Sequence, residues 1–225
     1  MKNTPEACTR GLLHIKQDSS RAAWKETLLK LLHHGSDTDN NTYCRDSMVV
    51  IEIEAPTPEA AEPLFPMSPQ ALATINHFIV TGADEEQVEH EWTKLYYHRI
   101  FDAPNSQIEY LISKLSGLEP APESIISLWD KTIDQEAAIS PCTLVIWARK
   151  KAGKLELHVH AHSSDAYKKL LMNLQEFIAL HLYLAERVGI QPGRYLHVID
   201  SCHIHRQDHA AAEELAARLA ASHNP

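Results

Sequence analysis

Histidines spaced like residues on one face of a strand are the first group that could carry chemistry. The chain has 15 histidines, and some fall in two runs in which every second residue is histidine. These runs are His158, His160 and His162, and then His203 and His205. Because side chains alternate between the two faces of a β-strand, the histidines of each run share a face.

Imidazoles gathered in this way can bind zinc or iron, with a nearby Cys142, Cys202 or Asp165 as a further ligand. One candidate metal site is therefore the set His160, His162, His203 and His205. The same spacing also occurs where histidines are only hydrogen-bonded structural residues or lie on a wet dimer surface.

Four cysteines form a second group. Cys8, Cys44, Cys142 and Cys202 lie far apart and form no CxxC pair, which predicts neither a disulfide framework nor a thiolate zinc site. Cys142 follows Pro141, directly before the strand-like run TLVIWA. Single thiols are usually inert core residues, but a thiolate is also a nucleophile of covalent catalysis, and the residue types alone leave both roles open.

The elements that must position these residues are predicted by periodicity and by breakers. Residues 165–188 form a long helix, apolar on most faces, with Asn173 in its middle. A buried amide must find hydrogen-bond partners, so Asn173 is either satisfied within the core or contacts a ligand. Further helices are predicted over residues 20–35, 84–101, 106–117 and from residue 208, and strands over 47–54, 124–129, 143–148, 154–162 and 194–205.

This order of helices and strands predicts an α/β or α+β fold with one main sheet. The 225 residues suit a single domain over 1–225, with residues 1–19 expected as a flexible start and 208–225 as a C-terminal helix. A formal charge of −9 without a basic stripe disfavours nucleic-acid binding. No apolar run is long enough for a signal peptide or a membrane span, so a cytoplasmic protein is expected.

The run SQIEYLISKL, then SIISLWD, SPCTLVIWARKKAGKLELHVHAHSSD, a long helix with Asn173 and finally GRYLHVIDSCHIH resembles thymidylate synthases and their nucleotide hydroxymethylase relatives over roughly residues 20–210. The resemblance is greatest to the shorter, archaeal-type members. It implies a thymidylate synthase-like fold, in which one mixed sheet is packed by helices around a long buried central helix. It also implies a homodimer paired through its sheet, and one-carbon transfer from methylenetetrahydrofolate to C5 of a pyrimidine.

The resemblance also assigns roles to residues. Pro141-Cys142 matches the family's Pro-Cys, which makes Cys142 the nucleophile that adds at C6 of the pyrimidine ring. Asn173 matches the asparagine that contacts the base, where an amide favours a uracil-like edge. The remaining implied residues are Tyr97 and His203 as proton handlers, Asp165 at the cofactor end, and His162, Ser163 and His205 as lining of the substrate pocket.

This sequence also departs from the family's pattern, mainly where the family holds a phosphate with arginines. Those positions carry His162, Pro122-Glu123 and the DNN stretch around Asn40. An imidazole, an acid and neutral amides replace charge-assisted forks, so the expected substrate is not ordinary dUMP. Two alternatives remain from the sequence: a histidine-ligated iron or zinc enzyme on the same fold, and a non-catalytic homologue that only binds a small molecule.

Overall fold

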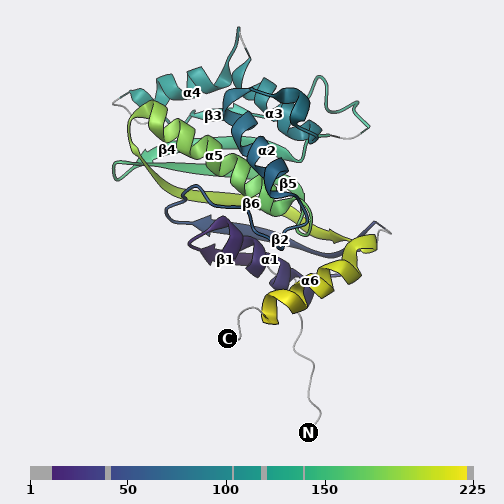
Figure 1. Cartoon of the computed structure of the whole chain (residues 1–225). Coiled ribbons are helices and arrows are strands. Elements are labelled where there is room, and N and C mark those ends of the chain that lie inside the picture. The colour runs from purple at the N-terminus through teal and green to yellow at the C-terminus, as the bar shows by residue number, and fades with distance from the viewer. Residues whose placement is uncertain (1–11, 39–41, 103, 118–120, 139, 222–225) are drawn as a thin grey trace.

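The computed structural model describes residues 12–38, 42–102, 104–117, 121–138 and 140–221. Figure 1 shows helices stacked over one twisted sheet. The strands are β1 (Leu13–Gln17), β2 (Tyr43–Ile53), β3 (Ile125–Ser127), β4 (Thr143–Lys151), β5 (Lys154–Asp165) and β6 (Gln191–His205). The helices are α1 (Ser20–His34), α2 (Pro69–Thr81), α3 (Glu91–Phe101), α4 (Gln107–Ser116), α5 (Leu170–Val188) and α6 (His209–Ala221), with short 3-10 turns η1 (Glu85–Gln87) and η2 (Arg206–Asp208).

The sheet is mixed and has the strand order β1-β2-β6-β5-β4-β3. β1 runs parallel to β2 and β5 parallel to β6, whereas the other neighbours are antiparallel. The parallel pairing of β5 with β6 sets Asp165 opposite His203, and the β4–β5 pairing sets Thr143 opposite Ala161. The start of β4 and the ends of β5 and β6 therefore meet at one end of the sheet.

Helix α5 is the centre of the helical layer. It packs directly on β5 and β6, and α2 packs on α5 from the other side. Twelve of its 19 residues are buried, including Phe177 and Leu180, so it is covered on several sides as its apolar sequence predicts. Gly189, at φ 76°, ends the helix in the left-handed conformation that suits glycine.

Helix α1 is fastened to the turn that leads into α5. Its N-terminus is capped by Ser19, whose side chain accepts a hydrogen bond from the backbone N–H of Ala22. Trp24 is fully buried, and its indole N–H donates to the carbonyl of Ala166 at 2.9 Å. This bond ties the first helix to the segment that follows Asp165.

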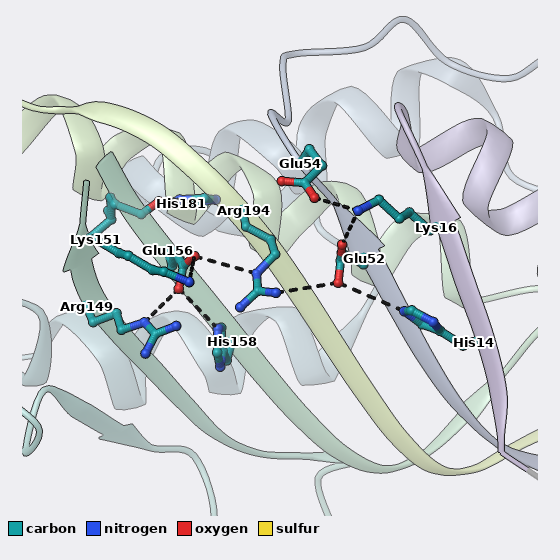
Figure 2. Close-up of polar contacts among 11 residues, drawn as sticks. His14, Lys16, Glu52, Glu54, Arg149, Lys151, Glu156, His158, His181 and Arg194 are labelled. Atoms are coloured by element: carbon teal, nitrogen blue, oxygen red, sulfur yellow. Dashed lines mark hydrogen bonds and ion pairs between the residues drawn. The ribbon is translucent and has the colours of Figure 1, made fainter. Parts of the chain in front are cut away.

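The sheet face turned away from the helices carries a row of alternating charges (Figure 2). Lys16 lies 2.7 Å from Glu52, Arg194 lies 3.5 Å from Glu52 and 3.6 Å from Glu156, and Arg149 lies 2.6 Å from Glu156. These five residues come from β1, β2, β6, β5 and β4 in spatial order. We call this row the charge ladder.

The two carboxylates of the ladder are largely shielded from water. The side chains of Glu52 and Glu156 are 12% and 9% exposed. The hydrogen bond from Lys16 lowers the pKa of Glu52. Burial opposes ionisation of Glu156, but Arg149 and Arg194 lower its pKa below the ordinary value. Each acid is therefore stabilised in its charged form by cations on both neighbouring strands.

The structure confirms the predicted fold class, with one mixed sheet packed by helices. It also contains two elements that the sequence pattern did not predict: β1, inside the expected flexible start at 1–19, and helix α2. The helix expected over residues 84–101 is divided into η1 and α3. None of the helices in the described ranges is both long and apolar enough to cross a membrane.

Candidate functional site

A cavity of about 390 Å³ opens where the start of β4 meets the ends of β5 and β6. Its walls also come from the N-terminal part of α3 and the first turn of α5. The lining residues are Tyr43, Glu89, His90, Glu91, Trp92, Tyr96, Cys142, Ser163, Ser164, Asp165, Lys169, Asn173, His203 and His205.

Cys142 lines this cavity and directly precedes β4. It is half-buried, and its sulfur lies 3.4 Å from the hydroxyl oxygen of Ser163, which is placed to donate to it. The carbonyl of Cys142 accepts the backbone N–H of His162 at 2.9 Å, which fixes the segment against β5. A thiol that touches a cavity and a hydroxyl donor can act as a nucleophile on a bound ligand.

Asn173 enters the cavity from the first turn of α5. Its side-chain nitrogen donates to Oε1 of the buried Glu176 at 2.8 Å. Its side-chain oxygen lies 3.4 Å from the hydroxyl of Ser164. The amide is thus held from both ends while it still lines the cavity.

His203 and His205 lie at the end of β6, where Tyr43, the first residue of β2, pairs with His205. The ring of His203 stacks on Tyr43 with centroids 3.7 Å apart, and His205 meets both rings edge-on. Nδ1 of His203 lies 3.1 Å from the carbonyl of Ser201, which can only accept, so Nδ1 carries the proton. Burial lowers the pKa of His203, so the ring is neutral near pH 7 and Nε2 carries a lone pair.

Asp165 ends β5 and organises the turn into α5. Its Oδ1 accepts the backbone N–H groups of Tyr167 and Lys168 at 2.9 and 3.1 Å. Its Oδ2 lies 4.0 Å from Nε2 of His205. The carboxylate therefore fixes the strand end and also contributes an acceptor to the cavity wall.

Of the two adjacent tyrosines of α3, Tyr96 lines the cavity, and the expected Tyr97 does not. Tyr97 packs against Phe78 and Phe101, with ring centroids 5.0 and 4.8 Å away, and it does not line the cavity. Tyr96 is 1% exposed, and its hydroxyl oxygen accepts the backbone N–H of Thr143 at 3.0 Å, next to Cys142. Burial raises the pKa of Tyr96, which keeps its hydroxyl protonated. The helical spacing of the buried residues Thr93, Tyr96 and Ile100 was the pattern that could have identified it.

The histidines of the metal hypothesis are not assembled into one site. His160 pairs with Asp200 at 3.0 Å, and His162 does not line the cavity that His203 and His205 share. Nε2 of His162 is buried without a hydrogen-bond partner. Across the described ranges there is no group of three or more histidine, cysteine or acidic side chains that could hold a metal ion.

The charges at the cavity differ from those of a phosphate site. Glu89, Glu91 and Asp165 line it together with a single lysine, Lys169, and no arginine of the described chain does so. Glu123, which stands at an expected arginine position, pairs with Lys114 at 2.7 Å and is exposed outside the cavity. The stretch around Asn40 lies outside the described residues.

Comparisons with known proteins agree with this architecture. The sequence profile of the family described as "Thymidylate synthase" matches residues 85–225, which include the whole segment from α3 to α6. A protein of Methanocaldococcus jannaschii with the name "Putative thymidylate synthase" is 26% identical over 207 residues, which cover 86% of this chain and 91% of that protein. The profile matches more than half of the chain, and the chain therefore belongs to the thymidylate synthase family.

Proposed function

We propose that this protein transfers a one-carbon unit to C5 of a pyrimidine or related heterocycle through a covalent adduct with Cys142. The observation that carries the proposal is the convergence of a half-buried thiol, an oriented amide and a neutral histidine on one cavity. Family membership suggests the same reaction type.

The proposed chemistry begins at the sulfur of Cys142. The carbon C5 of a pyrimidine is a weak nucleophile until a thiolate bonds to C6, which moves the ring electrons into an enolate and makes C5 able to attack. The hydroxyl of Ser163, 3.4 Å from the sulfur, stabilises the thiolate by donating to it. C5 would bond to the one-carbon unit, and loss of the C5 proton would return an electron pair to the ring, which expels sulfur from C6 as the thiolate. The new carbon would break its bond to the donor nitrogen and take up hydroxide from water, which gives a hydroxymethyl group, or hydride from the donor, which gives a methyl group.

The other cavity residues hold and polarise the ring. Asn173 contacts its carbonyl and imide N–H. The lone pair on Nε2 of His203 accepts protons, and the hydroxyl of Tyr96, in place of Tyr97, is a donor beside Cys142. Ser163 and His205 line the substrate pocket. His162 lies outside the lining and holds the position of Cys142, because its backbone N–H donates to the carbonyl of Cys142.

Methylenetetrahydrofolate would supply the carbon, by family resemblance. The cavity has an aromatic residue, Trp92, and a carboxylate, Asp165, in its lining, which suits a flat heterocycle with polar edges. These two residues are the proposed contacts at the cofactor end.

The proposed substrate lacks a phosphate. Three acids and one lysine at the cavity would repel a phosphate dianion, whereas an uncharged base or nucleoside would enter without that cost. Calorimetric titration with deoxyuridine and dUMP tests this. We expect deoxyuridine to bind at least as tightly as dUMP, and micromolar binding of dUMP alone would show that other cations replace the lost arginines.

The charge-ladder face is the proposed contact between two copies of the chain, as the family resemblance implies. Beside the ladder, Val50, Leu196 and Val198 lie half-buried on the same face of β2 and β6. An apolar patch bordered by shielded charges is a composition found in stable protein interfaces.

Release of tritium from C5-labelled substrate tests the reaction itself. Wild-type protein with methylenetetrahydrofolate should release tritium from labelled uracil, deoxyuridine or dUMP, and Cys142→Ser should lose at least a thousandfold in rate because its hydroxyl is a far weaker nucleophile at neutral pH. If a folded wild-type protein binds these compounds but releases no tritium, it is a binding homologue and not a transferase.

A further inference from the structure

A fully buried glutamate stands directly behind the cavity. Glu176 is 0% exposed and lies one helical turn after Asn173, inside the apolar sequence LLMNLQEFIAL of α5. Transfer of a carboxylate out of water is costly unless specific donors compensate it. Among the ion pairs of the described chain, none includes Glu176. The contacts that compensate this residue must therefore be hydrogen bonds.

Those hydrogen bonds come from two sides of the cavity. The side-chain nitrogen of Asn173 donates to Oε1 at 2.8 Å, and the hydroxyl of Thr93 donates to Oε2 at 2.8 Å. Thr93 also lies 3.0 Å from Nδ1 of His90, a residue of the cavity wall. The carboxylate is thus the centre of a buried chain that joins His90 on the α3 side to Asn173 on α5.

The carboxylate determines which end of the Asn173 amide faces the ligand. An ionised carboxylate only accepts hydrogen bonds, so the amide nitrogen must face Glu176, and a flipped amide would set two oxygens against each other. The oxygen of Asn173 is then left toward Ser164 and the cavity, beside the second N–H of the amide. A ligand edge complementary to this arrangement has a ring N–H next to a carbonyl.

We propose that Glu176 is a positioning residue that fixes the amide of Asn173, so that the cavity selects an imide edge, as in uracil, over the ring-nitrogen and amino edge of cytosine. The proposal rests on the proposed function in one respect, that Asn173 contacts the base. Thr93 supports the same orientation because its hydroxyl occupies the second carboxylate oxygen.

The charged surroundings of Glu176 are consistent with this role. Burial raises its pKa to about 7, against the lowering effects of Asn173, Thr93 and the more distant Lys169. The other titratable groups near it are His90, whose pKa is lowered to about 4, and the tyrosines Tyr96 and Tyr195, whose pKa values are raised. These neighbours are neutral near pH 7, so above that pH the single charge at this position is the carboxylate.

The matched variant is Glu176→Gln, which keeps the shape but can offer either an oxygen or an N–H to Asn173. Glu186→Gln, an exposed position on the same helix, is the control. Calorimetric affinities for deoxyuridine and deoxycytidine are measured at pH 8, without cofactor or turnover. We expect the wild-type preference for deoxyuridine to fall about tenfold or more in Glu176→Gln, because one misoriented polar pair costs about that factor. An unchanged preference in a folded variant would overturn the proposal.

A second measurement needs no ligand and so separates this inference from the proposed function. The side-chain amide protons of Asn173 are followed by ¹⁵N-resolved hydrogen exchange in the free protein. They should be protected in the wild type and in Glu186→Gln, and exchange about tenfold faster or more in Glu176→Gln, whose weaker hydrogen bond opens more often. Equal exchange in all three proteins would show that Glu176 does not hold the amide, whether or not the protein transfers one-carbon units.

Discussion

Glu176 makes the stability of the protein depend on pH in a direction opposite to that of most acids. Its pKa is about 7 in the folded protein against an ordinary value of 4.5. Its stabilising contribution is therefore complete below about pH 4.5 and is lost as the pH rises through 7, because only the unfolded chain gives up the proton easily. The difference between the two pKa values corresponds to about 3 kcal/mol.

The variant Glu176→Gln cannot ionise at this position, so its stability should lack this dependence on pH. Its unfolding free energy relative to wild type should rise by about 3 kcal/mol between pH 4.5 and pH 8. Buried His181 and His197, whose pKa values are lowered to about 4 and about 3, destabilise both proteins alike at low pH and cancel in the difference. Urea unfolding of both proteins at several pH values measures this difference in unfolding free energy. A difference that does not change with pH would contradict the assigned pKa of Glu176.

Some residues of the site could be predicted from the sequence, and others could not. Cys142, Asn173, Asp165 and His203 were predicted as one group, and they do line one cavity. Their roles stay predictions. The sequence predicted Tyr97 at the site, whereas its neighbour Tyr96 lines the cavity. A shift of one residue turns a helical side chain by about 100°, and only the packing of the helix decides which of the two tyrosines faces the cavity. Glu176 was missed because a charged residue in an apolar helix carries no pattern of its own.

At the scale of elements, Gly82 makes the turn between α2 and α3 possible. It ends α2 at φ 66°, and a Cβ at this position would lie 2.3 Å from the ring of Tyr97. Gly153, in the β4–β5 hairpin, has a similar φ of 75° but nothing within 4 Å. Alanine substitutions at the two glycines would therefore differ in one respect: both strain the backbone, but only the one at Gly82 also causes a steric clash.

We expect Gly153→Ala to cost about 1 kcal/mol, the strain of a left-handed alanine alone. Gly82→Ala should cost about 2 to 4 kcal/mol, because Tyr97 must also move out of its stack with Phe101. Thermal unfolding of both variants measures the difference. Equal costs would mean that Tyr97 yields freely and does not fasten α3 to α2.

Most elements were predictable, and the omissions have physical causes. The long helix α5 and the β4–β5 hairpin have strong periodicity and clear breakers. β1 has five residues and buries only Ile15 completely, so it is too short to show an alternating pattern. The N-terminus of α2 was marked by Ser68, which caps it through the N–H of Ala71, and by Pro69. The proline-rich segment before it obscured that signal.

At the scale of the whole molecule, the charge-ladder face predicts a dimer (Figure 2). Light scattering should give twice the chain mass of 25.4 kDa. Val198→Glu places an acid at the half-buried centre of this face, whereas Ile133→Glu places one at an exposed apolar residue elsewhere. We expect the first variant to weaken the dimer about a hundredfold and the second to leave it unchanged. A monomeric wild type would refute the proposed interface.

Strand order is the property that the sequence could not provide. The site exists because β6, the last strand in the chain, lies between β2 and β5, which brings His203 beside Asp165. Such pairings join segments far apart in sequence, and local periodicity carries no information about them. The family resemblance predicted that Asp165 and His203 belong to one site, but it gave no strand order, and neither did the composition and spacing.

The central claim, an adduct between Cys142 and C6 of a pyrimidine, is tested most directly with 5-fluoropyrimidines and methylenetetrahydrofolate. Fluorine at C5 cannot leave as a proton does, so the reaction should stop with the ring bonded to sulfur. Intact-protein and peptide mass spectrometry should then show one added ligand, with its carbon donor, on the peptide that contains Cys142, and none in Cys142→Ser. If the fluorinated base, nucleoside and nucleotide all bind the folded wild type without such an adduct, Cys142 is not the nucleophile.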